Sequence, residues 1–237
     1  MRVLSSTGAM ASVVVGTIAV AAGWSWGILL IVHFVAASAL SKIGEDRKSK
    51  SVAAIVEKFG ERDATQVMAN GAVYAAAALG HIANNSPIWY ALGIGALAAS
   101  AADTWATEIG TLSTRRPVSI VTGLPIPAGT SGGISFLGLL ASFFGALFIA
   151  AGGALARWPV PFTAIALGGL AGGLSDSLLG ATLQTRRWCD VCAKATERVV
   201  HDCGNPTRRT GGIHHLGNDA VNAICSAVGA LITLLLS

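Results

Sequence analysis

Long apolar stretches separated by polar loops dominate the chain, and their hydrophobic residues do not alternate as they would in barrel strands. About 20 apolar residues are needed for a helix to span a bilayer. The pattern therefore predicts about seven membrane-spanning helices. They are expected at Ser5–Ala22, Trp24–Ser41, Thr65–Ile82, Pro87–Gly110, Gly133–Ala156, Val160–Thr182 and Asn218–Leu236.

The composition supports this interpretation, since 53% of the residues are hydrophobic and only 12% are charged, against about 25% charged in soluble domains. We expect an all-α polytopic membrane protein in which residues 1–237 form a single domain. The 29 glycines predict close helix packing in a compact bundle. A homo-oligomer remains open at this point.

The basic residues predict the orientation. The N-terminal tail and the loops near 42–64, 111–132 and 183–217 hold every Lys and Arg except Arg157. By the positive-inside rule these loops and the N-terminus are cytoplasmic. The net charge of +4 could help to draw anionic phosphates to this face and requires no nucleic-acid partner. Loop 42–64 is either a solvated loop or a short interfacial helix.

Four carboxylates, Asp103, Glu108, Asp176 and Asp219, lie inside or at the ends of apolar stretches. A charge in hydrocarbon costs roughly 2.5–3.5 kcal/mol on insertion scales, so such residues usually have a function. All four fall toward the cytoplasmic ends of their helices. Carboxylate oxygens suit Mg²⁺, which commonly bridges substrate phosphates. We expect Asp103, Asp176 and Asp219 to converge on Mg²⁺; a single aspartate could instead cap a helix or form a buried pair, and Asp219 is placed well for a cap.

Asp176 also belongs to a ridge of small residues, with Gly168, Gly172 and Gly180 at steps of four. These glycines would allow either a ligand or a neighbouring helix to approach the backbone closely.

Candidate phosphate-binding residues lie on the same face. The loop Gly129-Thr-Ser-Gly-Gly133 is expected to open the fifth helix, where backbone amides bind anions; the alternative is a flexible turn. Lys42 could neutralise a phosphate or simply reach the interface, and Asn70 is polar at membrane depth. The predicted set comprises Lys42, Asn70, Thr107, Gly129, Thr130, Ser131, Gly132, Gly133, Thr182, Asn218 and Asn222.

The loop near 183–217 contains a separate cluster. Cys189, Cys192, His201 and Cys203 offer four ligands suited to a structural, tetrahedral Zn²⁺. Free thiols are the alternative, because disulfides are disfavoured on the reducing side of the membrane.

Several motifs occur in a fixed order: Asn70-Gly71, Asp103-Thr-Trp-Ala-Thr-Glu-Ile-Gly110, Gly129-Thr-Ser-Gly-Gly133, Asp176-Ser-Leu-Leu-Gly-Ala-Thr182 and Asn218-Asp-Ala-Val-Asn222. Together they resemble the transmembrane-protein-nineteen family of polytopic membrane proteins, over nearly the whole chain. This family includes the phytyl-phosphate kinase of tocopherol synthesis in plants and cyanobacteria.

The resemblance implies a membrane kinase that transfers the γ-phosphate of a nucleoside triphosphate, with CTP as a candidate donor, to phytyl phosphate or a related isoprenoid monophosphate. Asp103, Asp176 and Asp219 would hold Mg²⁺, and Glu108 would be a further ligand. Gly129–Gly133 and Lys42 would bind phosphates, and Asn70, Asn218 and Asn222 would orient them. The glycine ridge would form the groove for the prenyl tail.

Three other functions remain open on sequence grounds. A CTP-dependent prenol kinase or a lipid-phosphate cytidylyltransferase would use a similar site. A transporter predicts acids near the bilayer midplane and a repeat symmetry that the chain does not show. A scaffold without chemistry leaves the cost of the four acids unexplained.

Overall fold

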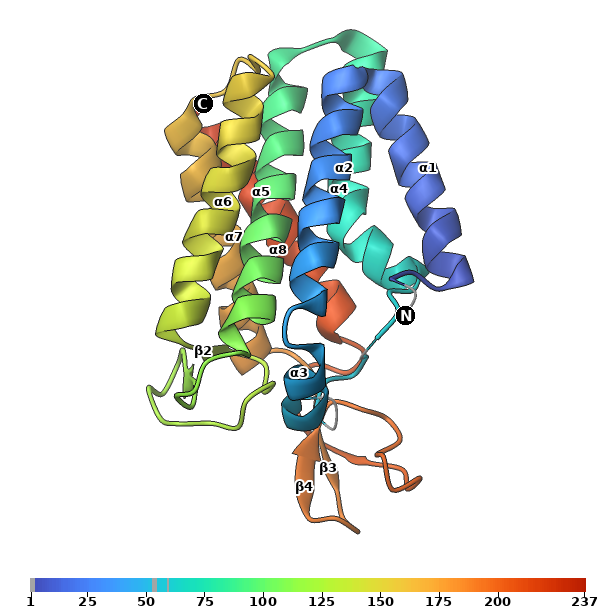
Figure 1. Ribbon diagram of the computed structural model, residues 1–237, viewed down its shortest axis with the longest axis vertical. Coiled ribbons are helices and arrows are strands. Elements are labelled where there is room, and N and C mark those ends of the chain that lie inside the picture. The colour runs from blue at the N-terminus through green and yellow to red at the C-terminus, as the bar shows by residue number, and fades with distance from the viewer. Residues whose placement is uncertain (1–2, 53–54, 59) are drawn as a thin grey trace.

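The computed structural model describes residues 3–52, 55–58 and 60–237 and consists mainly of long helices (Figure 1). Seven of them form a bundle: α1 (Ser6–Ala22), α2 (Trp24–Lys42), α4 (Ala64–Asn84), α5 (Pro87–Gly110), α6 (Phe136–Leu155), α7 (Phe162–Thr182) and α8 (Asn218–Leu235). The predicted all-α polytopic fold is confirmed. Most predicted helix ends agree with the structure within two residues.

Four helices, α2, α6, α7 and α8, are long and apolar enough to cross a membrane by length and composition. The apolar helix α1 is shorter, with 17 residues. Both α4 and α5 exceed 20 residues but carry polar side chains such as Asn70 and Asp103. The polar residues that lower the hydropathy of these two helices are the ones from which a functional site was predicted.

The long connections lie together at one end of the bundle, and α1 begins near them (Figure 1). The C-terminus lies at the opposite end, beside the short connection that contains Arg157. This arrangement agrees with an odd number of helices crossing one layer. Which end faces the cytoplasm stays a prediction.

The connections contain short elements. The charged segment after α2 forms helix α3 (Glu45–Val52). A short helix was one of the two structures expected for this loop. Strands β1 (Val118–Ser119) and β2 (Gly133–Ile134) pair antiparallel. The segment between α7 and α8 forms a three-stranded sheet of order β4-β3-β5, from β3 (Arg186–Cys189), β4 (Lys194–Thr196) and β5 (Arg208–Gly211). The sequence did not indicate this sheet, because its strands have only three or four residues.

Side-chain caps fix several helix starts. Asp63 forms a capping box with Gln66 at the start of α4. The hydroxyl of Ser135 accepts from the N–H of Gly138 and caps α6. The expected helix start at Gly133 is therefore wrong, since Gly133 belongs to β2 and the helix begins three residues later. The glycine loop precedes the helix but does not form its first turn.

The glycines of α7 pack against other helices. A Cβ added at Gly168 would lie 2.0 Å from the Thr233 hydroxyl of α8, and one at Gly172 would lie 2.4 Å from the Ala99 Cβ of α5. Backbones approach this closely only where side chains are small. The ridge is thus a helix-packing surface, and the expected groove for a prenyl tail does not lie there.

Candidate functional site

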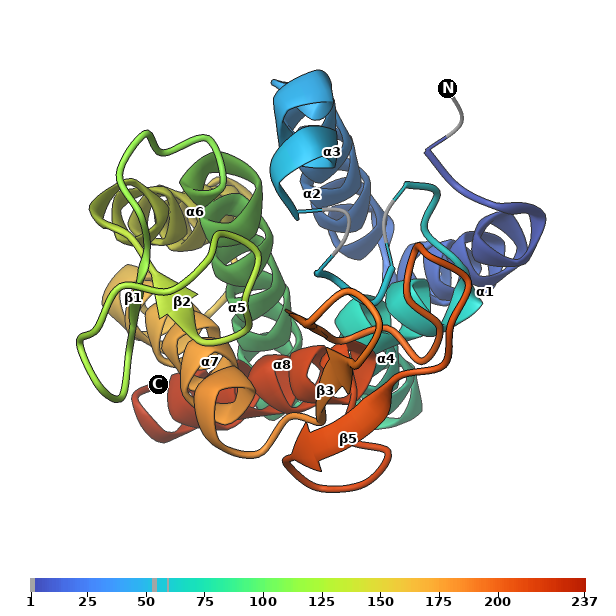
Figure 2. The same cartoon turned by 90° about the horizontal axis from the view of Figure 1, so that it is seen from below.

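A cavity of about 660 Å³ opens between the helices near the loop end of the bundle. Seen from that end, α5 lies between α6, α7 and α8 on one side and α2 and α4 on the other (Figure 2). Among the residues predicted for the membrane site, all of which the structure describes, only Thr182 does not line this cavity. The cavity brings together Lys42, Asn70, Asp103, Thr107, Glu108, Gly129, Thr130, Ser131, Gly132, Gly133, Asp176, Asn218, Asp219 and Asn222.

Thr182 ends α7 with an exposed side chain, and its hydroxyl donates to the Leu178 carbonyl. The prediction that it binds substrate does not agree with this position. It lies six residues after Asp176, which on a helix is nearly two turns beyond the acid and faces elsewhere.

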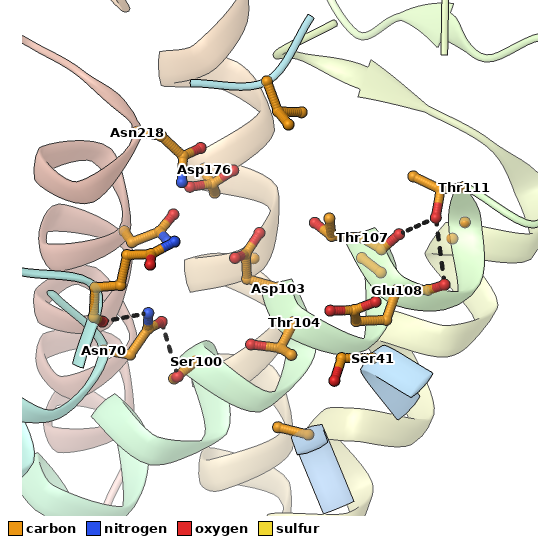
Figure 3. A pocket seen from close by; sticks show the side chains of 18 of the residues that line it. Ser41, Asn70, Ser100, Asp103, Thr104, Thr107, Glu108, Thr111, Asp176 and Asn218 are labelled. Atoms are coloured by element: carbon orange, nitrogen blue, oxygen red, sulfur yellow. Dashed lines mark hydrogen bonds between the residues drawn. The ribbon is translucent and has the colours of Figure 1, made fainter. Parts of the chain in front are cut away.

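Asp103 of α5 and Asp176 of α7 form the centre of the cavity. Both carboxyl groups line the cavity, and Figure 3 shows both in the space between the helices. Asp176 Oδ1 is buried and has no hydrogen-bond partner among the residues that the structure describes. In the same described ranges, no basic side chain forms an ion pair with either acid. A buried, unpartnered carboxylate oxygen beside a second carboxylate is a donor set that fits Mg²⁺.

Glu108 lies farther along α5 and is already paired. Its Oε2 is 2.6 Å from Lys48 Nζ of α3, whose side chain is only 5% exposed, and its Oε1 is 4.0 Å from Arg62. Lys48 also donates to the Leu40 carbonyl at the end of α2. Glu108 therefore ties α3 to α5, and its role as a further metal ligand stays a prediction.

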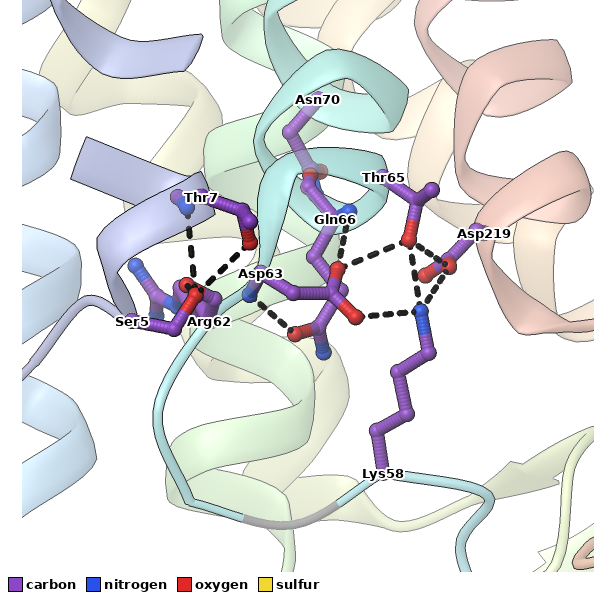
Figure 4. Close-up of polar contacts among 10 residues, drawn as sticks. Ser5, Thr7, Lys58, Arg62, Asp63, Thr65, Gln66, Asn70 and Asp219 are labelled. Atoms are coloured by element: carbon purple, nitrogen blue, oxygen red, sulfur yellow. Dashed lines mark hydrogen bonds and ion pairs between the residues drawn. The ribbon is translucent and has the colours of Figure 1, made fainter. Parts of the chain in front are cut away.

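Asp219 also has a basic partner. Its Oδ2 accepts from Lys58 Nζ at 2.6 Å and from the Thr65 hydroxyl at 2.9 Å, and Lys58 also pairs with Asp63 at 2.9 Å. Figure 4 shows this network linking the start of α4 to the start of α8. Asp219 is not an N-cap, because Gly217 holds that position. It lines the cavity with Asp103 and Asp176 but is neutralised by lysine, so direct metal binding by Asp219 stays a prediction.

The glycine loop is shaped by its backbone. Gly129 and Gly132 have φ angles of +86° and +80°, a region that glycine adopts without strain. A Cβ at Gly132 would lie 2.4 Å from the Ala181 Cβ of α7. The loop therefore packs directly on α7, the helix that carries Asp176.

This loop already binds a carboxyl oxygen of the chain itself. Both the N–H and the hydroxyl of Ser131 donate to Glu197 Oε1, at 3.3 and 2.5 Å. Burial raises the pKa of Glu197 to about 7; the bonds from Ser131 lower it, and repulsion from Glu57 and Asp176 raises it. The donors expected to bind phosphate thus hold a carboxylate contributed by the segment after β4.

A polar chain crosses the cavity wall between three helices. The Asn70 amide nitrogen donates to the Gln66 carbonyl, and its Oδ1 accepts from the Ser100 hydroxyl at 3.0 Å (Figure 3). Ser100 lies 3.4 Å from His33 Nε2 of α2. Asn70 is therefore held in place by α4 and α5, with its polar group at the cavity.

One part of the cavity lining is apolar. Side chains from α1 and α2 line it: Val15, Leu30, Ile31, Phe34 and Ala37. A ligand with a polar head and a hydrocarbon tail would fit this arrangement, with its head at the acids and its tail against these two helices.

The cysteine cluster forms a second site outside the cavity. The ligand atoms of Cys189, Cys192, His201 and Cys203 all lie within 4.8 Å of one another. The predicted grouping of these four residues is confirmed, while the metal itself remains to be tested.

Several cavity residues were missed by sequence reasoning: His33, Lys48, Lys58, Arg62, Ser100 and Glu197. His33 is an ionisable residue inside an apolar helix, so the rule that identified the acids would have found it. The lysines, Arg62 and Glu197 carry no local signal, because their partners lie far away along the chain.

Comparison with known proteins identifies the family. The model of the integral membrane protein family DUF92 matches residues 1–230. The chain belongs to this family. A relative in Arabidopsis thaliana, Protein PGR, is 32% identical, with 99% of this chain and 89% of the relative aligned.

Two microbial relatives extend the comparison. An uncharacterized membrane protein of Methanocaldococcus jannaschii is 29% identical over 99% of this chain and 86% of its own length. One from Synechocystis is 32% identical over 70% of this chain and 66% of its own length. No solved structure matches the chain. The DUF92 assignment agrees with the family resemblance drawn from the motifs.

Proposed function

We propose that this protein is a membrane kinase that transfers the γ-phosphoryl group of a nucleoside triphosphate, with CTP as the candidate donor, to phytyl phosphate or a related isoprenoid monophosphate. The observation that carries the proposal is the pair Asp103 and Asp176, with the unpartnered Asp176 Oδ1, inside a cavity that also holds the glycine loop. Phosphoryl transfer needs mainly positioning and charge neutralisation, and this cavity offers both.

The proposed reaction is an in-line displacement. An oxygen of the isoprenoid monophosphate attacks the γ-phosphorus, and the bond from that phosphorus to the β,γ-bridging oxygen breaks. The products are the isoprenoid diphosphate and the nucleoside diphosphate. The attacking phosphate oxygen is already a nucleophile at neutral pH, so the reaction does not require a strong base.

The chain's own residues supply the positions. Asp103 and Asp176 would hold Mg²⁺, which would neutralise charge on the nucleotide phosphates. Ser131 would donate its N–H and hydroxyl to a phosphate oxygen after the Glu197 carboxyl group has moved away from these donors. Asn70, Asn218, Asn222 and Lys42 also line the cavity. The asparagine amides would orient the phosphates, and Lys42 would supply a cation.

The apolar wall of α1 and α2 is the proposed tail site. An isoprenoid chain would lie against Leu30, Ile31 and Phe34, with its phosphate at the polar end of the cavity. The isoprenoid phosphate and the triphosphate of the nucleotide both need room, and about 660 Å³ falls in the range of small-molecule sites.

The test uses the purified protein in liposomes with phytyl phosphate, Mg²⁺ and CTP labelled at either the α- or the γ-phosphate. Transfer of the γ-label to a lipid diphosphate is the expected result. Transfer of the α-label would identify a cytidylyltransferase, and phosphorylation of phytol itself would identify a prenol kinase. No transfer with CTP, ATP, GTP or UTP would overturn the proposal.

Magnesium binding has a second readout that is independent of turnover. A ligand at 100 times its Kd stabilises the folded state by about 2.7 kcal/mol. We expect Mg²⁺ to raise the melting temperature of the wild-type protein but not that of Asp176→Asn. An equal rise in both proteins would place the magnesium elsewhere.

A further inference from the structure

The segment between α7 and α8 brings three cysteines and one histidine together outside the proposed active site. Cys189 ends β3, and Cys192 follows in the turn that leads to β4. That turn contains Ala193 with a φ of +50°. His201 and Cys203 lie in a second turn, which the N–H of Gly204 closes by donating to the His201 carbonyl. The hairpin of β3 and β4 thus contributes two ligands, and the second turn contributes the other two.

The distances fit tetrahedral coordination. Cys189 Sγ lies 3.6 Å from Cys203 Sγ, which lies 3.3 Å from His201 Nδ1. With Zn–S bonds of about 2.3 Å and Zn–N bonds of about 2.0–2.1 Å, ligand atoms around tetrahedral zinc are about 3.5–3.8 Å apart. All three cysteines are free thiols.

Hydrogen bonds already surround the sulfur atoms. The N–H of Cys192 donates to Cys189 Sγ at 3.5 Å, and the Asn205 amide donates to Cys203 Sγ at 3.4 Å. Outer partners of this kind orient metal ligands and stabilise thiolates. The four ligand atoms also lie close to one point, an arrangement that metal binding requires and free thiols do not.

We propose that Cys189, Cys192, His201 and Cys203 bind one structural Zn²⁺. Each cysteine binds as a thiolate after releasing its proton to solvent, and His201 binds through a neutral ring nitrogen. All four positions of a tetrahedral ion are then filled by the protein, which is typical of structural rather than catalytic zinc.

The site connects to the cavity through the chain that follows β4. The N–H of Glu197 donates to the Ile55 carbonyl of the α3–α4 connection at 2.8 Å, and the Glu197 carboxylate accepts from Ser131. Zinc would hold the two turns on either side of this segment. It would therefore fix the piece of chain that occupies the donors of the glycine loop.

The first experiment measures metal in the full-length protein purified without chelators. We expect about one zinc per chain by mass spectrometry. Removal of zinc followed by addition of Co²⁺ should give the absorption of tetrahedral cobalt with thiolate ligands. Zinc-free protein that does not take up Co²⁺ would overturn the proposal, and this arm requires no variant to fold.

Matched cysteine variants then locate the ion. Cys203→Ser should reduce the zinc content at least about tenfold. Cys225→Ser changes the fourth cysteine, which is buried in α8, and should retain zinc. Full zinc in Cys203→Ser, or equal loss in both variants, would contradict the assignment. Neither outcome depends on kinase activity, so this proposal can fail while the proposed function stands.

Discussion

The two faces of α5 show how one helix can serve both packing and chemistry. Toward α7, its Ala98, Ala99 and Ala102 meet glycines, and Cβ atoms added at Gly169 and Gly172 would lie 3.0 and 2.4 Å from alanine Cβ atoms. Near the loop end, the side of α5 toward α2 and α4 carries polar side chains such as Ser100, which line the cavity. Small side chains close the first interface, and polar groups of moderate size leave the second one hollow.

The closed face also positions the acids. A Cβ at Gly173 would lie 3.3 Å from Ala102 and 3.5 Å from the backbone nitrogen of Asp103. Asp176 follows Gly173 by three residues, so the close helix contact brings the two carboxylates together at its end. The packing of α5 against α7 therefore sets the geometry of the cavity. Variants at this helix contact should change stability, and variants at the acids should change activity.

The largest expected effect is a loss of activity when one of the two acids that line the cavity is replaced. Asp103→Asn and Asp176→Asn should each reduce γ-phosphoryl transfer at least about a hundredfold, because each removes an oxygen charge that the proposed Mg²⁺ needs. The melting temperature should hold or rise, since one of two adjacent acids is gone. Initial rates and thermal unfolding measure both quantities, and full activity in either variant would remove that residue from the mechanism.

The next effect is on stability at the packed face. Gly172→Ala would place a methyl group 2.4 Å from Ala99 and 2.8 Å from the Cys225 carbonyl, and forcing such contacts typically costs about 1–3 kcal/mol. The matched control is Gly16→Ala in α1, where a Cβ meets nothing within 4 Å. The control should unfold no earlier than the wild type. Equal stability of Gly172→Ala would mean that the α5–α7 contact is looser than described.

A smaller effect on stability is expected at the start of α4, where the polar network described above links this helix to α8. Partial burial opposes the shift, but the hydrogen bonds from Lys58, the Gln66 N–H and Thr65 lower the pKa of Asp63 to about 2. Its charge therefore stabilises the fold above pH ~4, and this contribution is lost as the pH falls toward 2. Asp63→Asn keeps a cap but loses the ion pair.

We expect Asp63→Asn to cost about 0.2–1 kcal/mol at pH 7, as for other solvent-accessible pairs. The difference from wild type should shrink as the pH falls below about 4. Asp190→Asn, which breaks an exposed pair with Arg208, is the control. A cost for Asp63→Asn that does not change with pH would show that the charge itself contributes nothing.

The sequence predicted those features that depend on local properties. Hydropathy and length located seven helices, and the cost of charge in hydrocarbon identified Asp103 and Asp176. It could not reveal partners distant in the chain: Lys58 reaches Asp219 across 161 residues, and Glu197 reaches Ser131 across 66. The glycine ridge suited either a ligand or a helix, and only the position of α8 decides for the helix.

A comparison of two threonines gives the sharpest check on where the site ends. Thr107 and Thr182 are both threonines in the motifs that carry the family resemblance, yet only Thr107 lines the cavity. Thr107→Val should lower the rate about tenfold if its hydroxyl contributes one hydrogen bond to the ligand. Thr182→Val should stay within about twofold, because its exposed hydroxyl donates only to the Leu178 carbonyl. Rates of γ-label transfer compare the two variants directly. An equal loss in both would mean that the site extends past the end of α7, and that the cavity described above is only part of it.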